Sequence, residues 1–410
     1  MTRSTRDARR IMSAQAVRAF AYGFGAVLLG VTLDQRGYSS STVGLVLTAV
    51  IAGTVLLSLW LARFGDRVGR RRCYVAMYLA LGGVGVVFAL PSPIWLLILA
   101  SLTGTLSTEV VESGPFTSLE QPMLATELTG SARLRGFGRY NAVATLSGSL
   151  GSLCAGLPDL VHHWWRGAPS DDRYFLVFVP IALAGAFIAS TLSPAVEAPA
   201  ESRAERRGTP VIRSRPVVVR LSALFALDSF GGGLVVQAFV AYWLTTRFHA
   251  ALDTVGFVFF ASGLLQTVSF LAAVRIGRRF GLLRTMVFTH LPSNVLLASI
   301  AFAPNLATAV TLWLVRVTLS QMDVPARQSY VMTLVDPAEQ TAAAAYTNTA
   351  RYLTRPVGPA LAGASQSLAL GLPFLLAGSI KALYDLTLWA WFRRVPVPDA
   401  GEADDAAPGR

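Results

Sequence analysis

Long apolar stretches, separated by short polar or Pro- and Gly-containing connections, run along almost the whole chain. A helix needs about 20 predominantly apolar residues to cross the hydrocarbon core of a bilayer. Twelve stretches are near that length or longer, and they are residues 12–33, 42–62, 73–90, 94–119, 137–157, 174–193, 217–245, 254–274, 285–303, 306–326, 342–366 and 372–392. Connections as short as Pro91-Ser92-Pro93 and Pro304-Asn305 require consecutive helices to run antiparallel. The pattern predicts an all-α membrane protein with twelve transmembrane helices.

Arginine is distributed unequally between the two sets of connections that these helices create. One side carries Arg3, Arg6, Arg9, Arg10, the 63–72 loop, Arg133, Arg135, Arg203, Arg206, Arg207, Arg213, Arg215, Arg275, Arg278, Arg279, Arg284, Arg393 and Arg394. The other side carries Arg36, Arg166, Arg173 and Arg247. Because cytoplasmic connections are enriched in Lys and Arg, we expect both termini in the cytoplasm and His162 outside. The expected location is a bacterial inner (plasma) membrane.

Composition agrees with a membrane protein and argues against two other classes. Hydrophobic residues make up 53% of the chain, charged residues 14%, and the mean hydropathy is +0.52. Soluble domains carry about 25% charged residues. The net charge of +12 would suit a nucleic-acid partner, but the arginines lie in short loops and form no basic face, so we expect no nucleic acid. Cys73 and Cys154 would lie on opposite sides of the bilayer, which disfavours a disulfide.

The chain divides into two halves that resemble each other. Residues 194–216 form the longest polar connection, which predicts a cytoplasmic linker between six-helix halves at 1–193 and 217–394, followed by a polar tail at 395–410. A shift of 207 residues places four residues on identical ones: Gln121 on Gln328, Asn141 on Asn348, Gly151 on Gly358 and Gly156 on Gly363.

The connection between the second and third helices has a distinctive sequence. It reads Arg63-Phe64-Gly65-Asp66-Arg67-Val68-Gly69-Arg70-Arg71-Arg72. Its Asp-Arg-x-Gly-Arg-Arg core resembles the loop signature of the major facilitator superfamily, a large class of secondary transporters. The Gly that begins the family motif is Ala62 here, and the second-half copy, residues 275–281, lacks the Asp. The resemblance implies two parallel six-helix repeats around a site near the membrane midplane, and transport by alternating access.

The resemblance also implies roles for individual loop residues. In the superfamily, the loop Asp interacts with the start of the eleventh helix, and a loop Arg pairs with an acid at the end of the fourth. Asp66 is therefore expected to face residues 343–346, and Arg70 to pair with Glu120. The predicted cytoplasmic gate consists of Asp66, Arg67, Gly69, Arg70 and Glu120. Alternatively, this motif only sets the topology.

Acidic residues at membrane depth are the candidates for proton coupling. Intramembrane charges are costly and usually serve function, and in the superfamily the first, fourth, seventh and tenth helices line the cavity. The candidates are Glu109 and Glu112 on the fourth helix, Asp228 on the seventh and Asp323 on the tenth. The repeat places Glu109 on Arg316, so these two residues are expected to form an ion pair. That pair is either structural or one that breaks and reforms during transport.

Basic and polar residues at similar depth are the candidates for a substrate site. They are Arg316, Ser320, Arg351, Arg355 and Gln237. Arg351 and Arg355 need anions, which are either membrane carboxylates or an anionic substrate.

Other membrane-depth residues have structural explanations. Arg18 is expected to snorkel to the interface, and Lys381 is expected to neutralise Asp385 four residues later. Residues 231–233, three glycines, either loosen the seventh helix or allow close packing.

Enzyme and cofactor motifs are absent from the sequence. His162-His163 lie beside Trp164-Trp165, as in an interfacial anchor, and His249 and His290 have no partner at metal-ligand spacing. We expect no enzyme activity, cofactor or metal.

The expected function is proton-coupled export of a small organic or amphipathic compound by a monomer in the lipid bilayer. The fourth helix lacks the Arg, and the fifth the Gly-Pro motif, that are frequent in drug exporters of the superfamily. One alternative is proton- or ion-coupled uptake of an organic anion. Another is a non-transporting membrane sensor or assembly protein with the same fold.

Overall fold

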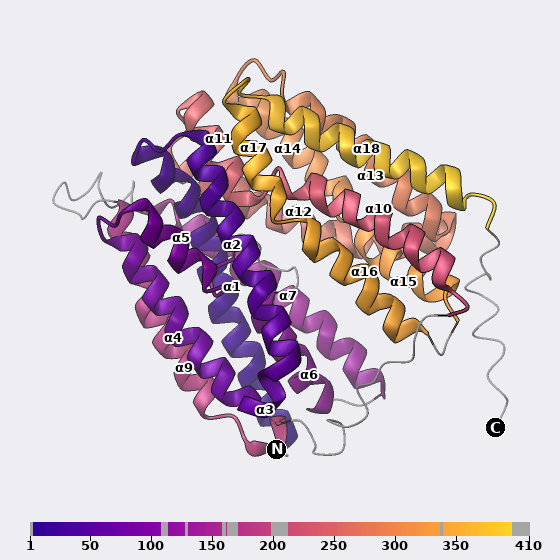
Figure 1. Ribbon diagram of the computed structural model, residues 1–410, viewed down its shortest axis with the longest axis horizontal. Helices are drawn as coiled ribbons and strands as arrows, with labels where there is room; N and C mark the ends of the chain where they lie inside the picture. Colours follow the sequence, from indigo (N-terminus) through magenta and orange to yellow (C-terminus); the bar gives the residue numbers. More distant parts are fainter. Residues whose placement is uncertain are drawn as a thin grey trace. The chain divides into compact units, whose positions relative to one another are not determined.

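The computed structural model describes residues 3–107, 114–127, 130–157, 161, 171–197, 212–336 and 339–395, and every regular element in these ranges is a helix (Figure 1). The first-half α-helices are α1 (Arg3–Gln35), α2 (Ser40–Trp60), α3 (Asp66–Val68), α4 (Arg70–Ala89), α5 (Ile94–Leu102), α6 (Pro115–Glu127), α7 (Gly130–Cys154) and α9 (Phe178–Ser190). The second-half α-helices are α10 (Arg215–Gly233), α11 (Gln237–Phe248), α12 (Leu252–Phe280), α13 (Leu282–Ile300), α14 (Leu306–Ser320), α15 (Asp323–Leu334), α16 (Gln340–Thr354), α17 (Val357–Gln366) and α18 (Leu372–Phe392). Three short non-α turns are η1 (Leu61–Gly65), η2 (Asp171–Val177) and η3 (Pro194–Val196).

Eleven of the twelve predicted segments coincide with one helix or with consecutive helical pieces. In the fourth segment, residues 94–102 form α5, residues 103–107 are not helical, and residues 108–113 lie outside the described residues. Helices dominate because the hydrocarbon core offers no water to backbone N–H and C=O groups, so each segment must bond them internally. By length and composition, six stretches of the described residues could cross a membrane: Arg6–Gln35, Ser40–Val68, Arg70–Ala89, Arg173–Ser190, Arg215–Phe248 and Leu252–Gly277. Breaks in the tenth and eleventh segments leave pieces of 15 and 12 residues and of 15 and 10 residues, shorter than one span.

The breaks in the seventh and eleventh segments have local causes. In the seventh, α10 ends at the last of three glycines, and α11 begins after Val236, whose backbone is extended. In the eleventh, Pro356 separates α16 from α17, because proline has no N–H to donate to the preceding turn. A methyl group on Gly358 would lie 2.3 Å from the carbonyl carbon of Gly233. At Gly358 the glycine therefore serves close packing of the two breaks.

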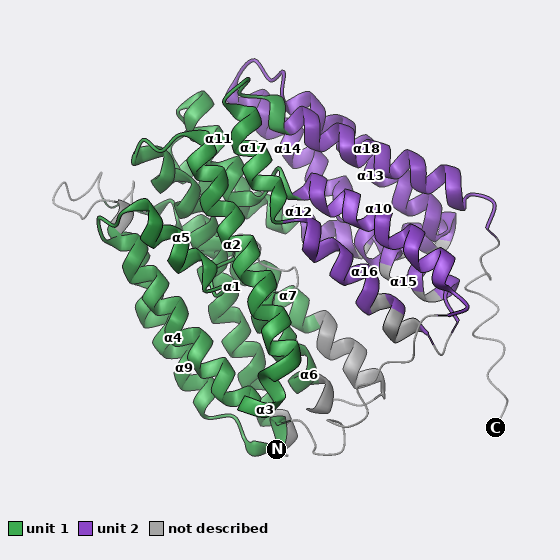
Figure 2. Ribbon diagram, viewed as in Figure 1, with its two compact units in different colours: residues 1–206, 233–264, 356–373 green, residues 207–232, 265–355, 374–410 purple. Residues whose placement is uncertain are grey.

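The chain forms two compact units (Figure 2). Unit 1 contains residues 1–206, 233–264 and 356–373, and unit 2 contains residues 207–232, 265–355 and 374–410. Two of the places where the chain passes from one unit to the other, at residues 232–233 and 355–356, fall at the breaks in the seventh and eleventh segments. The division into halves at 1–193 and 217–394 remains a prediction.

Each unit has its own packed interior. In unit 1, α1 packs against α7, α4 against α9, and α2 against α17. In unit 2, α13 packs against α14 and α15, and the core includes Leu224, Phe225, Tyr330 and Tyr384. This apolar core adjoins the buried polar residues described next.

Candidate functional site

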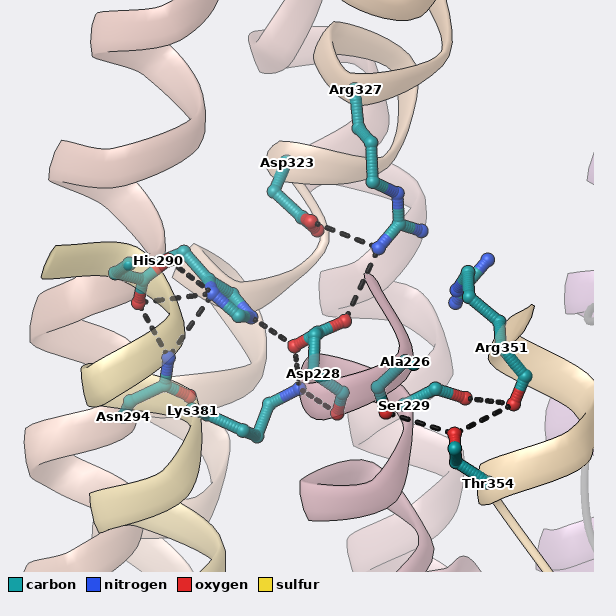
Figure 3. A network of polar contacts seen from close by, with 11 residues as sticks. Ala226, Asp228, Ser229, His290, Asn294, Asp323, Arg327, Arg351, Thr354 and Lys381 are labelled. Carbon is teal, nitrogen blue, oxygen red and sulfur yellow. Dashed lines mark hydrogen bonds and ion pairs between the residues drawn. The ribbon is translucent and has the colours of Figure 1, made fainter. Parts of the chain in front are cut away.

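A cluster of buried polar side chains joins four helices of unit 2, α10, α13, α15 and α18 (Figure 3). We call it the Asp228 network, and its members are Asp228, His290, Asn294, Asp323, Arg327, Lys381 and Asp385. Every member is at most 6% exposed. Since a buried charge costs several kcal/mol unless it is paired, the contacts within the network decide whether these residues can be accommodated.

Asp228 lies at the centre of the network. The Lys381 ammonium donates to its Oδ1 and, at 3.3 Å, to its backbone carbonyl. Arg327 Nη1 donates to Oδ2 at 3.3 Å, and His290 Nε2 lies 3.9 Å from Oδ1. Asp228 therefore has two permanent cations in direct contact and an imidazole within ion-pair distance.

Two further carboxylates share these partners or add new ones. His290 Nδ1 lies 2.9 and 3.1 Å from the two oxygens of Asp385, and Asn294 donates to Asp385 Oδ2 at 2.8 Å. Asp323 Oδ2 lies 3.4 Å from the same Arg327 nitrogen that contacts Asp228. One guanidinium is thus shared between two carboxylates.

Helical spacing explains how so few helices supply the network. Residues four apart lie on one helix face, which aligns His290 with Asn294 and Lys381 with Asp385. A methyl group on Gly231 would lie 2.8 Å from Lys381 Cγ. The missing side chain at Gly231 therefore leaves room for the Lys381 stem, whose ammonium pairs with Asp228.

Hydrogen bonds also join α10 to α16 next to Asp228. Ser229 Oγ donates to the Arg351 carbonyl at 2.9 Å, and Thr354 Oγ1 donates to the Ala226 carbonyl at 2.9 Å (Figure 3). These bonds fix the backbone that carries Asp228 against the neighbouring helix.

A second buried cluster lies in unit 1. Glu120 accepts from Arg18 Nε at 3.2 Å and Nη2 at 2.8 Å, from the Tyr74 hydroxyl at 2.7 Å, and from the Tyr140 hydroxyl. We call Arg18, Tyr74, Glu120 and Tyr140 the Glu120 cluster. All four side chains are buried.

Three predicted interactions are wrong. Arg18 does not snorkel to the interface but forms the ion pair with Glu120, because that carboxylate lies within its reach. Arg70 does not pair with Glu120: its Nε donates to Asp66 at 2.8 Å, one turn away, and its backbone N–H donates to Glu197 at 2.7 Å. Lys381 does not neutralise Asp385, because each has a partner on another helix.

The structure places only some of the predicted proton-coupling and substrate-site residues in the Asp228 network. Of the proton-coupling candidates, Asp228 and Asp323 come together in the network, while Glu109 and Glu112 lie outside the described residues. The Glu109–Arg316 ion pair therefore stays a prediction. The Arg316 guanidinium stacks over Trp313 at 4.9 Å, and Gln237 donates to Ser152 at 3.2 Å.

The other candidates on the tenth and eleventh segments bond within their helices or to a neighbouring helix. Ser320 donates to the Val317 carbonyl at 3.4 Å. The Arg351 carbonyl accepts from Ser229, the residue after Asp228. Arg355 follows the end of α16, just before the Pro356 break.

Sequence reasoning missed five members of the network as site residues. One is Arg327, four residues after Asp323, and for two others the signal was present. Lys381 and Asp385 were visible as membrane-depth charges but were paired with each other. His290 was considered only as a metal ligand, and Asn294 was not considered, although the two residues share a helix face. Within the described residues, no group of His, Cys, Asp and Glu could hold a metal ion.

Outside the predicted membrane segments, a carboxylate binds the end of the linker. Glu339 accepts from the backbone N–H groups of Ile212, Arg213 and Ser214 at 2.8, 2.9 and 2.9 Å. These bonds stabilise the ionised form and lower the pKa of Glu339 to about 2.

Comparisons with known proteins agree with this architecture. The chain is 26% identical over 423 residues to an uncharacterized membrane protein of Saccharomyces cerevisiae, covering 95% of this chain and 94% of that protein. Its structure is similar to that of the nucleoside transporter NupG (TM-score 0.73, 12% identity, 96% of this chain and 100% of that one). It is also similar to the inward-open xylose transporter XylE from E. coli (TM-score 0.70, 14% identity, 96% and 97%) and to the human organic anion transporter TETRAN (TM-score 0.63, 17% identity, 95% and 100%).

At these identities the structural similarities show the fold. The family assignment comes from the sequence, because residues 11–359 match the model of the Major Facilitator Superfamily. The chain therefore belongs to the major facilitator superfamily of membrane transporters.

Proposed function

We propose that this transporter couples the movement of a small organic or amphipathic compound to protons, and that it exports that compound across a bacterial inner membrane by alternating access. The observation that carries the proposal is the Asp228 network. Three carboxylates and a histidine are buried together there, in contact with Lys381 and Arg327.

Shared partners make such a network responsive to a proton. Arg327 contacts both Asp228 and Asp323, so it can remain paired when either carboxylate changes its charge or position. In a low-dielectric interior, one added or lost charge changes the interaction energies by several kcal/mol. Such a change is large enough to bias an equilibrium between two arrangements of the helices.

A second candidate function is proton-coupled uptake of an organic anion. Arg316, Arg351 and Arg355 add three guanidinium groups beyond the cations of the network. Arg316 Nε has no hydrogen-bond partner among the described residues. A carboxylate or phosphate on a substrate would offer acceptors to this group.

Proton flux in proteoliposomes tests the proposal and separates the two candidates. Vesicles loaded with the pH dye pyranine receive organic cations, neutral amphipaths and organic anions in turn. Export by antiport predicts that a cation or amphipath accumulates in acid-inside vesicles while their interior becomes more alkaline. Anion uptake by symport predicts accumulation of an anion from an acidic exterior. Transport of a compound at a rate independent of the pH gradient, with no proton flux, would contradict both.

A further inference from the structure

His290 is the member of the Asp228 network whose two ring nitrogens both face carboxylates. Nδ1 lies 2.9 and 3.1 Å from the oxygens of Asp385 on α18, and Nε2 lies 3.9 Å from Asp228 on α10. The ring is 3% exposed and packs edge-on against Tyr384, with centroids 5.9 Å apart. Its position between two acids from different helices determines which protonation state fits.

A neutral imidazole has a single N–H, whereas imidazolium has two. Ionised Asp385 can only accept hydrogen bonds, so its two short contacts require a hydrogen on Nδ1. The Asn294 amide nitrogen also lies 3.1 Å from Nδ1. Because this amide donates to Asp385 Oδ2 at 2.8 Å, the two Asp385 contacts still require the hydrogen on Nδ1. A neutral ring would then direct the Nε2 lone pair toward the Asp228 carboxylate. Only the doubly protonated ring presents an N–H to both acids.

The acids of the network differ in how firmly permanent cations hold them. Asp228 contacts Lys381 and Arg327, two permanent cations. Asp323 contacts Arg327.

Asp385 has a different environment. Among the described residues, its contacts are His290 and Asn294, and neither is a permanent cation. When His290 loses its second proton, Asp385 therefore loses the positive charge beside it.

Lys381 is placed to replace that charge. It lies one helical turn from Asp385 on α18, and this spacing allows a direct ion pair. In the present arrangement its ammonium instead crosses to Asp228. Arg327 would remain with Asp228 if Lys381 moved. The network thus has two arrangements that differ in one proton and one ion pair.

We propose that His290 carries the coupled proton, bridging Asp385 and Asp228 when doubly protonated and transferring Lys381 from Asp228 to Asp385 when it is neutral. The only covalent change is the N–H bond at Nε2, whose proton passes to water on the side to which the transporter is open. Transfer of Lys381 removes the ion pair between α18 and α10. This inference rests on the proposed proton coupling and names the group responsible for it.

Nuclear magnetic resonance tests the protonation state without any substrate. The chain has four histidines, so ¹⁵N-histidine labelling gives few ring signals, and His290→Gln assigns the one that matters. We expect an imidazolium signal for His290 at pH 7, and its loss at that pH in Asp385→Asn. A neutral His290 ring throughout pH 6–8 would overturn the proposal.

Transport measurements test the coupling itself. With a compound that drives proton flux in the wild type, His290→Gln should lower that flux at least tenfold and leave compound exchange within about twofold. His249→Asn is the matched control, because Asn tolerates the left-handed backbone at that position (φ 52°). Exchange that persists in His290→Gln also shows that the variant is folded.

Different results would refute the proton coupling of the transporter and the role of His290 in it. A wild type that transports without proton flux would refute the proton coupling. A wild type with proton flux that His290→Gln retains in full would refute the role of His290 alone. Loss of exchange together with proton flux, in both His290→Gln and His290→Asn, would assign the residue a structural role and overturn the inference.

Discussion

The Glu120 cluster of unit 1 and the Asp228 network of unit 2 both bury charges, but they pair them differently. In the first, one carboxylate meets one guanidinium, and each carboxylate oxygen accepts from Arg18 and from a tyrosine. In the second, Arg327 contacts two carboxylates, and Asp228 has three cationic or titratable neighbours. In the Glu120 cluster every partner is used once, whereas in the Asp228 network a charged group can leave one partner and still keep another.

This difference indicates separate roles for the two clusters. A fully bonded pair has no alternative arrangement of similar energy, so it holds α1 against α6. A network with shared partners can lose one contact and form another at lower cost. Buried charge by itself therefore does not mark a transport function; the availability of a second partner does.

The largest expected effect on stability comes from removing the Glu120 carboxylate from the Glu120 cluster. Glu120→Gln leaves the Arg18 guanidinium buried without its anion, which costs about 3–5 kcal/mol. Unfolding of the purified protein in detergent, followed by tryptophan fluorescence, measures the loss. The double variant Arg18→Gln/Glu120→Gln should lose less than Glu120→Gln alone. A double variant as unstable as the sum of the single variants would show that the residues act separately.

Asp228→Asn should have a smaller effect on stability and a large one on coupling. Arg327 keeps Asp323, and Lys381 can turn to Asp385, so the expected cost is about 1–3 kcal/mol. Gradient-driven transport should fall at least tenfold while compound exchange continues. Full coupled transport by this variant would place the coupling outside the network, with Glu112 and Glu109 as the next candidates.

Neighbouring glycines provide a matched test of the Lys381 position. A methyl group at Gly231 would press on Lys381 Cγ at 2.8 Å, whereas at Gly232 its nearest neighbour is Lys381 Nζ at 3.9 Å. Gly231→Ala should cost about 1–3 kcal/mol through overpacking and weaken coupling. Gly232→Ala should leave both nearly unchanged. Equal effects of the two substitutions would exclude a steric role for Gly231.

The smallest effect concerns Glu339 and acid. Its pKa falls from an ordinary 4.5 to about 2 on folding, so its contribution to stability is present above about pH 4.5 and is lost as pH falls toward 2. Hydrogen exchange at the amides of residues 212–214 should quicken relative to the unfolded chain below pH 4. In Glu339→Gln the same amides should show reduced protection at neutral pH, with no added loss in acid. Equal acid sensitivity in this variant would assign the effect to another carboxylate.

Local pattern was sufficient to predict much of this protein. The length and hydropathy of each segment decide whether it forms a membrane helix, and these are properties of consecutive residues, so eleven of the twelve predicted segments coincide with helices of the described residues. The loop at residues 63–72 indicated the family. The cost of burying charge in a bilayer identified Asp228 and Asp323 before any contact was known.

Partner choice required the tertiary structure. Spacing alone permits Lys381 to pair with Asp385, and the loop signature permits Arg70 to pair with Glu120. In the folded chain Lys381 contacts Asp228 on α10, because Gly231 leaves room for its stem and His290 and Asn294 already occupy Asp385. Arg18 is the cation that reaches Glu120. Which of several nearby charges meet depends on how each helix is rotated and on which groups have already found partners, and neither is a property of consecutive residues.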